Sequence, residues 1–401
     1  PLEGIRIIDL GTVIAGPFNT MQLADLGADV IKVEEPLAAE RRNMPGGGLL
    51  FQSNDLIPVG VYRDRNKEAI SLNLKHPKGL ELLLDLIRTS DAVTENFSPG
   101  TMDRMGIGYD VLKAINPKIV YASVSAFGQT GSYKHHRGYD ILAQARTGFA
   151  SVTGFPEDPP TRAGNSITDY YAGLLSAFSI LSAIRHAEKT GYGQTIDIAL
   201  FEGLFMTLEG YAERALNNNE TPTRLGMDSL THGPACAVYP DSEGTLVAID
   251  VHRDEWWASF CEAANRPDLS EGSATSNYKG RQDNPNTIKD AISVFMSNFS
   301  SEEAEKILEA VGIPISRVLT VQEMVELPHI NDRGLYPTVN HPKAGPVKIT
   351  GTAYAGLTKT PGTVFAHPPM ANEHGPLVLE RVLGYRQDQI KEMEDDGVFS
   401  V

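Results

Sequence analysis

The first 34 residues carry the pattern that most restricts the fold of this chain. An apolar strand is predicted at 4–10, a helix at about 18–26 and a second strand at 29–34. A strand, a helix and another strand in so short a span indicate a βαβ unit with parallel strands. The sequence therefore predicts the beginning of a doubly wound α/β sheet.

Three further strands and a helix continue this pattern. The strands are predicted at 70–74, 91–95 and 118–124, and the helix at 76–88 has Pro77 in its first turn, where proline is tolerated. Residues 35–68 are polar and rich in Arg and Gly, so we expect an irregular surface segment there. Together these segments predict one nucleotide-type sheet within the first ~150 residues.

A long apolar segment follows, and an aspartate lies at its start. Residues 170–184 are small or apolar on almost every side, which is typical of a buried helix, here predicted at 169–188. Asp169 falls in the first turn, where the helix dipole and free N–H groups stabilise negative charge. We therefore expect a lowered pKa and an ionised carboxylate. The simpler alternative is a helix cap with no catalytic role.

The rest of the chain indicates a second, smaller domain. The predicted elements are a strand at 194–200, a helix at 201–217, a loop at 218–231, a strand at 245–251, a helix at 255–265, a helical stretch at 286–312 with Ser301 as a cap, two short strands, and a closing helix at 377–394. We predict a large Rossmann-like domain at 1–200, a linker at 201–224, a small α/β domain at 225–330, and a linker with a C-terminal segment at 331–401 that returns to the large domain.

Composition and charge exclude several classes of protein. Apolar residues make up 41% of the 401 residues, enough for a substantial core, and the net charge of −16 argues against nucleic-acid or anionic-membrane partners. Cys236 and Cys261 provide neither a disulfide framework nor metal-ligand spacing. We see no apolar run of membrane-spanning length and no signal peptide, and expect a cytoplasmic enzyme.

Basic residues recur in the loops that should follow the strands. They are Lys75, Arg104 and the run 134–137. Because open α/β sheets bind ligands at the carboxyl ends of their strands, these cations predict a site for a polyphosphate ligand. Each cation taken singly is more typical of a solvated surface.

The loop at 11–17 and the absence of other motifs narrow the chemistry. The loop has the spacing GxxxxGP, and Pro17 lacks the amide that a phosphate cradle needs, so this is not a dinucleotide fingerprint. It is either a structural turn or a close approach of backbone to a ligand. The sequence shows no catalytic triad and no metal cluster. Asp169 remains as a candidate carboxylate nucleophile, with amides of nearby glycines to stabilise an oxyanion.

Many short motifs in one order give the chain a family resemblance. They are 1–10, 15–17, 26–34, 65–67, 72–75, 95–100, 103–106, 138–140 with Gln144, 169–173, 190–194, 232–234 and 312–314. In these residues the chain resembles the family III CoA-transferases of the CaiB/BaiF type, which include formyl-CoA:oxalate and carnitine CoA-transferases, along with α-methylacyl-CoA racemases. The resemblance extends over nearly the whole chain.

The resemblance implies an acyl-CoA:carboxylate CoA-transferase with Asp169 as nucleophile. The carboxylate would attack the thioester to give a mixed anhydride and then an aspartyl-CoA thioester. Coenzyme A and acyl-CoA are substrates, with no permanently bound cofactor and no metal. The residues carried over for CoA binding are Ile14, Ala15, Leu72, Asn73, Leu74, Lys75, Asn96, Phe97, Ser98, Arg104, His136, Arg137, Gly138 and Tyr139.

Two departures from the family pattern bear on the substrates. Ile14 stands where oxalate-using members have Gln, and Glu35 stands where they have Arg after the second strand. We therefore expect an acceptor acid other than oxalate and a different grip on the phosphates. A dicarboxylate such as succinate fits the range of the family.

Two rival functions and the assembly follow from the same resemblance. A racemase of this superfamily uses a His at the position of Tyr139, and a tyrosine with a pKa near 10 is a poor base at neutral pH. A non-catalytic CoA-binding subunit of a heteromeric transferase would have no need of Asp169. The family also implies an interlocked homodimer in which each chain threads through a ring formed by the other, and a heterodimer with a paralogue remains open.

Overall fold

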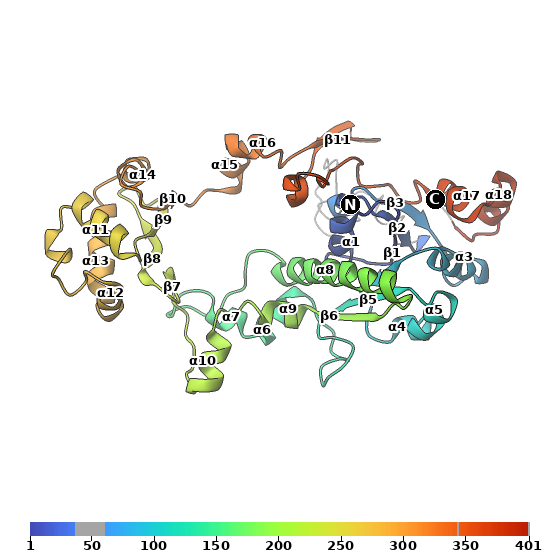
Figure 1. The fold of residues 1–401 in the computed structure, drawn as a ribbon, viewed down its shortest axis with the longest axis horizontal. Coiled ribbons are helices and arrows are strands. Elements are labelled where there is room, and N and C mark those ends of the chain that lie inside the picture. The colour runs from blue at the N-terminus through green and yellow to red at the C-terminus, as the bar shows by residue number, and fades with distance from the viewer. Residues whose placement is uncertain (37–60, 343–344, 400–401) are drawn as a thin grey trace. The chain divides into compact units, whose positions relative to one another are not determined.

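The computed structural model describes residues 1–36, 61–342 and 345–399 (Figure 1). Contacts divide the chain into two units, the first made of residues 1–149, 163–209 and 329–401 and the second of residues 150–162 and 210–328. Unit 1 therefore combines the N-terminal half of the chain with the C-terminal segment. The two units are described separately below.

Six strands of unit 1 form one fully parallel sheet within the described residues. They are β1 (Arg6–Asp9), β2 (Asp29–Glu34), β3 (Glu68–Ser71), β4 (Ala92–Glu95), β5 (Val120–Ser125) and β6 (Thr195–Ala199), in the spatial order β3-β2-β1-β4-β5-β6. The chain moves outward in one direction from β1 to β3 and in the other from β4 to β6. This confirms the predicted doubly wound α/β fold.

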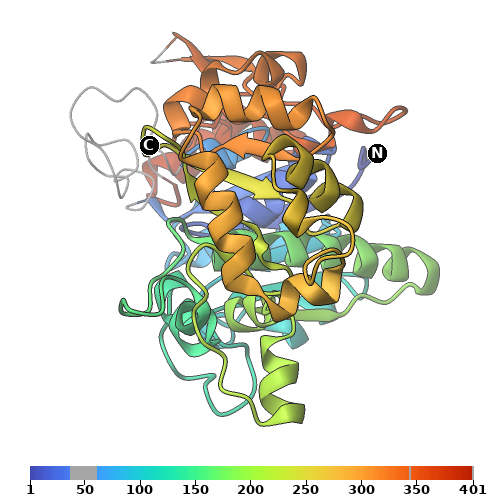
Figure 2. The same cartoon turned by 90° about the vertical axis from the view of Figure 1, so that its left-hand side faces the viewer.

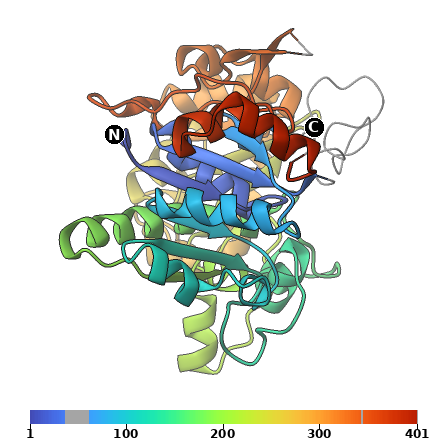
Figure 3. The ribbon, with the colours of Figure 1, turned by 90° about the vertical axis from the view of Figure 1, so that its right-hand side faces the viewer.

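Helices cover both faces of this sheet (Figure 3). One face carries α3 (Pro77–Arg88), α5 (Tyr109–Ile115), α17 (Gly375–Leu383) and α18 (Gln387–Asp395), and the other carries α1 (Ala15–Asp25) and α8 (Ile167–Thr190). Neighbouring residues of one strand serve opposite faces, since Ile8 packs toward α3 and Ile7 toward α8. Both side chains are fully buried, as expected for a parallel sheet between two helical layers.

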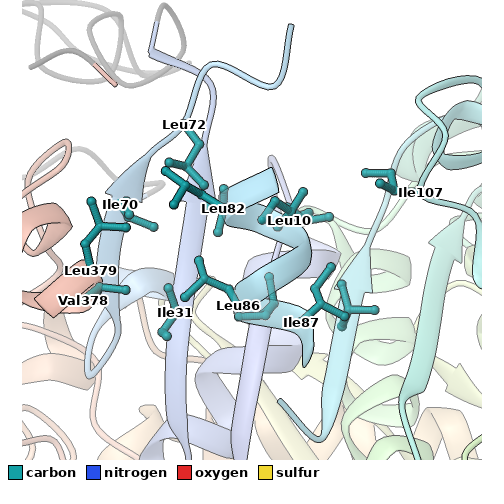
Figure 4. Packing of buried hydrophobic residues seen from close by; sticks show 14 of the residues in the cluster. Leu10, Ile31, Ile70, Leu72, Leu82, Leu86, Ile87, Ile107, Val378 and Leu379 are labelled. Atoms are coloured by element: carbon teal, nitrogen blue, oxygen red, sulfur yellow. The ribbon is translucent and has the colours of Figure 1, made fainter. Parts of the chain in front are cut away.

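The C-terminal segment completes the core beneath α3. Val378 and Leu379 of α17 lie against Ile70 of β3, beside Leu82 and Leu86 of α3 (Figure 4). The remaining described elements of unit 1 are η1 (Val61–Asp64), α4 (Thr101–Arg104), α6 (Asp140–Arg146), α9 (Leu200–Phe205), β11 (Thr338–His341), β12 (Gly345–Lys348) and η3 (Ala353–Gly356), with α7 (Phe149–Val152) and α16 (Pro328–Asp332) at its borders.

Unit 2 contains an antiparallel sheet with the order β10-β9-β8-β7 (Figure 2). Its elements are α10 (Tyr211–Asn218), β7 (Asp228–Ser229), β8 (Gly233–Pro240), β9 (Leu246–Asp250), α11 (Asp254–Ala263), η2 (Pro267–Leu269), α12 (Tyr278–Asp283), α13 (Pro285–Met296), α14 (Ser301–Glu309), β10 (Ile315–Arg317) and α15 (Val321–Glu326). Trp257, Phe260, Ile292 and Phe295 fill a separate core between the sheet and these helices. An independent core is what defines a domain physically.

Several predicted helices are interrupted in the structure. The helix predicted at 201–217 is divided into α9 and α10 because Glu209 and Gly210 both have positive φ angles, 45° and 86°. The stretch at 286–312 is likewise α13 and α14, and the cap of α14 is Ser300 in a capping box with Glu303, not Ser301. The closing helix at 377–394 is two helices, since Gly384 ends α17 in the left-handed conformation.

Two strand and helix limits also differ from the prediction. The helix predicted at 18–26 begins earlier, at Ala15, and tolerates Pro17 in its first turn. The strand predicted at 70–74 is β3 and ends at Ser71, whose amide donates to the side chain of Asn372, and the amide of Asn73 donates to the carbonyl of Val398 in the C-terminal segment. Residues 72–75 are therefore a loop. Of the irregular segment predicted at 35–68, residues 37–60 lie outside the described part of the chain.

The expectation that α8 is buried on every side was wrong. Its buried face consists of Ala172, Gly173, Ser176, Ala177, Ile180, Ala183, Ile184 and Ala187, whereas Leu174 and Phe178 are exposed, 45% and 70%. The helix has 24 residues and by length and composition alone could cross a bilayer, contrary to our expectation that no such run exists. Its buried face packs on α1 and the sheet, as in the core helix of a globular domain.

Candidate active site

The loops that follow β1 and β4 meet at the carboxyl edge of the sheet. The amide N of Thr12 donates to Oδ1 of Asn96 at 2.8 Å, and Nδ2 of Asn96 donates to the carbonyl of Thr12 at 2.7 Å. β1 and β4 are the neighbouring strands from which the chain winds in opposite directions. Ligands of open α/β sheets bind at this switch point.

Two buried lysines donate hydrogen bonds to backbone carbonyls of the 11–17 loop. Lys67 reaches Asp9 at 2.8 Å and the carbonyl of Pro17 at 2.9 Å, and Lys32 reaches the carbonyl of Gly11 at 2.9 Å. These lysines and Asp9 are almost completely buried, so breaking one pair would leave an uncompensated charge. Lys67, which belongs to the 65–67 motif, therefore stabilises the conformation of the 11–17 loop.

The same motif ties the C-terminal segment to the first helix. Arg65 forms a buried ion pair with Asp25 of α1 and donates to the carbonyls of Thr350 and Gly351. Asn66 bonds to Asp25 and accepts the amides of Phe365 and Ala366. The sequence marked these residues only as part of a resemblance, and their role is to join distant segments.

Tight packing and backbone strain shape the 11–17 loop itself. A Cβ on Gly11 or Gly16 would lie 2.8 Å from the backbone of the other glycine, so the spacing GxxxxGP closes a structural turn. Val13 has a φ of 63°, which is strained for a β-branched residue, and its carbonyl accepts a hydrogen bond from Nη1 of Arg63 at 3.2 Å. Strain of this kind is concentrated at functional sites.

The first turns of α1 and α8 come together at Asp169. Gly173, one turn after Asp169, allows this approach, since a Cβ there would lie 2.9 Å from the carbonyl O of Ala15 and from the ring of Phe18. The backbone amide of Ala15 lies on the side of Asp169 and lowers the pKa of its carboxyl. Two of the predicted residues, Ala15 and Asp169, are thus brought together by the approach of α1 to α8.

The carboxyl of Asp169 does not have the lowered pKa that its helix position suggested. Its pKa is raised to about 7, first by burial and then by the nearby negative charge of Asp140, while Arg63 and the Ala15 amide act in the opposite direction. Desolvation and a like charge outweigh the helix N-terminus here. Around neutral pH the group is therefore divided between the acid and the carboxylate.

Two tyrosines and an arginine form a cluster at the start of α8, and its Arg63 lowers the pKa of the Asp169 carboxyl. The hydroxyls of Tyr62 and Tyr170 are 2.6 Å apart, and Nη2 of Arg63 donates to the Tyr170 hydroxyl at 3.2 Å. The Arg63 guanidinium also lies over both tyrosine rings. Tyr170 follows Asp169 directly, but no local pattern reveals that 61–64 approaches it.

Asp140 is a further residue whose role the sequence did not reveal. It begins α6, and its Oδ1 accepts both the amide N of Thr168 at 3.0 Å and the Thr168 hydroxyl at 2.8 Å. Gln144, one turn later, donates to Oδ2 at 2.7 Å. The i, i+4 spacing of Asp140 and Gln144 in a matched motif was the available signal.

The predicted 72–75 loop follows β3 at the same edge. Leu72 is fully buried in the core and Leu74 is partly buried there, so their side chains serve packing. Asn73 accepts the amide of Lys75 at 3.1 Å and donates to the carbonyl of Gly397. Lys75 is 85% exposed and forms an ion pair with Glu35 at 3.4 Å. Glu35 therefore faces the cation expected to hold a phosphate.

The predicted 96–98 segment is anchored through the strand that precedes it. Oε2 of Glu95 accepts the amide of Phe97 at 2.7 Å, and Phe97 is half-buried against the core. Ser98 is exposed, and Arg104 is an exposed cation that bonds to Thr101 at 2.8 Å. Among the described residues, Asn96 is the member of this group that forms hydrogen bonds with the 11–17 loop.

The predicted 136–139 segment lies in the long loop after β5. His136 packs on Phe127 and Tyr133, and Arg146 covers the same two rings. Arg137 is exposed, and Tyr139 is 70% exposed just before α6. Gly138 has no room for a side chain, because a Cβ would lie 2.7 Å from Ala126. These residues adjoin Asp140 along the chain.

A cleft of about 440 Å³ lies elsewhere in unit 1. It opens at the amino ends of β1 and β2 and is lined by Arg6, Asp29, Glu68 and Arg381, which form ion pairs with one another. None of the predicted site residues lines it. This cleft is therefore separate from the carboxyl edge where Asp169 lies.

Comparison with known proteins places this architecture in one family. Residues 2–375 match CoA-transferase family III. The chain is 31% identical to the succinyl-CoA–D-citramalate CoA-transferase of Chloroflexus aurantiacus, over 97% of this chain and 96% of that protein. It is also 31% identical to the succinyl-CoA:glutarate CoA-transferase of Mus musculus, over 99% and 90%.

A solved structure agrees with these sequence relatives. A CaiB/BaiF family protein from Brucella suis superposes with a TM-score of 0.80 at 27% identity, covering 95% of this chain and 99% of that one. At this coverage the likeness extends to both units. The chain belongs to CoA-transferase family III, and it is a CoA-transferase.

Proposed function

We propose that the protein transfers CoA between a CoA thioester and a free carboxylic acid, with Asp169 as the nucleophile. The observation that carries this proposal is the close approach of α1 and α8 at Gly173, which places the half-buried Asp169 carboxyl beside the start of α1 and the loop that follows β1. A carboxylate partly shielded from water beside a backbone donor is suited to attack on a thioester.

The transfer can be written with no net proton change. The Asp169 carboxylate attacks the thioester carbonyl, the C–S bond breaks, and CoA leaves as a thiolate, which yields a mixed anhydride of Asp169 and the donor acid. The thiolate attacks the Asp169 carbonyl of this anhydride, and the donor acid leaves as its carboxylate. The acceptor carboxylate then attacks the aspartyl-CoA thioester and expels the thiolate, which yields a second mixed anhydride. The thiolate attacks the acceptor carbonyl of that anhydride, so that the new acyl-CoA forms and Asp169 leaves as its carboxylate.

The ionisation of Asp169 suits a group that must act as a nucleophile. A pKa of about 7 keeps a substantial fraction ionised at neutral pH. A more basic carboxylate is also the better nucleophile toward a carbonyl. The Ala15 amide is a donor that can bond to the oxygen that develops charge, a contribution of about 3–4 kcal/mol when well placed.

The loops around this carboxyl supply the proposed CoA site. Ile14 and Ala15 would adjoin the thiol arm, the segments 72–75 and 96–98 the nucleotide, and 136–139 the pantetheine. Lys75, Arg104 and Arg137 are exposed and therefore available to phosphates. CoA is a substrate in this proposal and is not retained as a cofactor.

The donor and acceptor acids are proposed from the names of the relatives and from the residue at position 14. Both relatives named above use succinyl-CoA by their names, with citramalate or glutarate as the second acid. We infer a succinyl-type donor and a short dicarboxylate acceptor. Ile14 replaces the polar residue of oxalate-using members with an apolar one, which argues against oxalate. The expected setting is the cytoplasm.

Exposed apolar side chains on three neighbouring helices support the proposed homodimer. Helices α6, α8 and α9 pack together, and they expose Ile141, Leu142, Leu174, Phe178 and Phe205. Monomers seldom leave so many large apolar residues in contact with water. An interlocked second copy is the proposed occupant. Light scattering at several protein concentrations tests this, and a monomer at micromolar concentration would contradict it, whereas dependence on a paralogue would indicate a heterodimer.

The decisive experiment replaces the nucleophile. Asp169→Asn should lower transfer of CoA from succinyl-CoA to glutarate by about 10³-fold or more. Hydroxylamine should trap an enzyme-bound thioester in the native protein and not in this variant. Asp110→Asn is the matched control, because Asp110 also lies in the first turn of a helix but is exposed. Full activity of Asp169→Asn would refute the proposal, and racemisation of a 2-methylacyl-CoA without an acid would indicate the racemase.

A further inference from the structure

We propose that Asp140 is the positioning residue of the Asp169 site, which anchors the first turn of α8 and sets the electrostatic environment in which the nucleophile works. This inference rests on the proposed role of Asp169. Asp140 itself contacts no reacting atom in the scheme above.

The anchoring is direct. Thr168 is the residue immediately before Asp169, and both its amide N and its hydroxyl donate to one oxygen of Asp140, at 3.0 and 2.8 Å. The residue at the N-cap of α8, Ser166, makes no side-chain capping bond. Asp140 therefore performs from α6 the capping that a local side chain usually provides. Any shift of α6 would move the first turn of α8.

The second oxygen of Asp140 is also fixed. Oδ2 accepts from Nε2 of Gln144 at 2.7 Å, and Oε1 of Gln144 accepts the amide of Ala163 at 2.8 Å. Asp140 is 6% exposed, and within the described part of the chain its hydrogen-bond partners, Thr168 and Gln144, are neutral donors. A buried carboxylate without a cationic partner exerts its charge on its neighbours with little screening.

That charge acts on Asp169 together with a small set of other groups. Asp140 from α6 raises the pKa of Asp169, and Arg63 from η1 and the Ala15 amide from α1 lower it. Other ionisable side chains on elements packed against α8 are Asp25 of α1, Tyr121 of β5, Arg146 of α6, Asp197 of β6 and Glu202 of α9. Asp25 is paired with Arg65, Asp197 accepts the amide of Gln129, and Arg146 lies on aromatic rings.

Neutral and conservative variants separate position from charge. Asp140→Asn keeps an oxygen for Thr168 and removes the charge, so the acidic limb of kcat/KM should move down by about one pH unit. Asp140→Glu keeps the charge and should keep the limb within a few tenths of a unit of the native one. If the acidic limb of kcat/KM in Asp140→Asn lies at the same pH as in the native protein, the proposal is overturned, even if the variant is less stable.

A swapped variant guards against misfolding. In Asp140→Asn an amide would face the Gln144 amide, so the double variant Asp140→Asn/Gln144→Glu restores one donor and one acceptor at this contact. The charge then sits one hydrogen bond further from Thr168, and the limb should again move down, by less. An unmoved limb in the double variant would also overturn the proposal.

The outcome is distinguishable from failure of the proposed function. If Asp169→Asn is inactive and the acidic limb of Asp140→Asn is not shifted, only the role of Asp140 is rejected. Active Asp169→Asn would reject the nucleophile itself. Hydroxylamine trapping in Asp140→Asn and Asp140→Glu tests whether the aspartyl-CoA intermediate still forms. A lowered rate with an intact intermediate is then not mistaken for loss of the reaction.

Discussion

Gly173 of α8 lies so close to Ala15 of α1 that a Cβ on the glycine would be 2.9 Å from the Ala15 carbonyl oxygen. This approach brings the start of α8, with Asp169, next to the start of α1, and the Ala15 amide lowers the pKa of the Asp169 carboxyl. A partly protonated carboxyl thus lies beside the loop that follows β1.

The pH profile should report the ionisation of Asp169. Because its pKa is raised to about 7, mainly by burial, the carboxylate is lost as the pH falls through about 7. We expect kcat/KM to fall tenfold per pH unit below about pH 6 and to be level above pH 8. A profile flat down to pH 5 would contradict a raised pKa at the nucleophile.

The same group should make the native protein less stable at higher pH. Its folded-state pKa lies above its unfolded value, so its stabilising effect is present below about pH 4 and is lost as the pH rises through about 7. Asp169→Asn removes this loss. The variant should have a Tm a few degrees above the native protein at pH 8 and a smaller gain at pH 5. Thermal unfolding at both pH values tests the sign.

Gly173 should tolerate no side chain. A Cβ there would meet the Ala15 carbonyl and the Phe18 ring at 2.9 Å, so Gly173→Ala should push α1 from α8 and destabilise the protein by about 1–3 kcal/mol. Turnover should also fall, because the Ala15 amide leaves Asp169. Gly356→Ala is the control, since that glycine has open space around it. Equal stability of the two variants would show that the approach is not tight.

Asn96 should matter for CoA binding more than for stability. Asn96→Ala loses the paired hydrogen bonds to Thr12 and frees the 11–17 loop, so the KM for the CoA thioester should rise about tenfold. Asn116→Ala is matched, since Asn116 likewise bridges segments by bonding to the carbonyls of Ile87 and Ser90. Its effect should be confined to the unfolding free energy. A similar KM rise in both variants would point to general loosening.

Glu35 should weaken the hold of Lys75 on a phosphate. Releasing Lys75 by Glu35→Gln should lower the KM for the CoA thioester two- to threefold at low salt, with the difference vanishing at high salt because the pair is exposed. Glu81→Gln, which releases Lys78 from a similar exposed pair, is the control. An unchanged KM in Glu35→Gln would place the phosphates away from Lys75.

The strand pattern at the N-terminus could be read correctly because it is local. The strand at 29–34 is β2 with the predicted limits, and its parallel pairing with β1 follows from the short βαβ connection. Helix interruptions were missed where single residues adopt positive φ, as at Gly210 and Gly384. The glycines at these positions were the available signal for a helix end, but many other glycines of the chain do not end a helix.

The sequence by itself determined three properties: the alternation of strands and helices that forms a parallel sheet, the family, and an aspartate in the first turn of a long apolar helix. Each of them follows from the order of residues along the chain. Only the tertiary structure decided the pKa of that aspartate, the exposure of one face of α8, and the contacts of Asp140, Asn96 and Arg63. Desolvation and charge depend on which distant segments come close. Here they outweigh the helix end, so the carboxyl expected to be fully ionised is held near the point of half-ionisation at neutral pH.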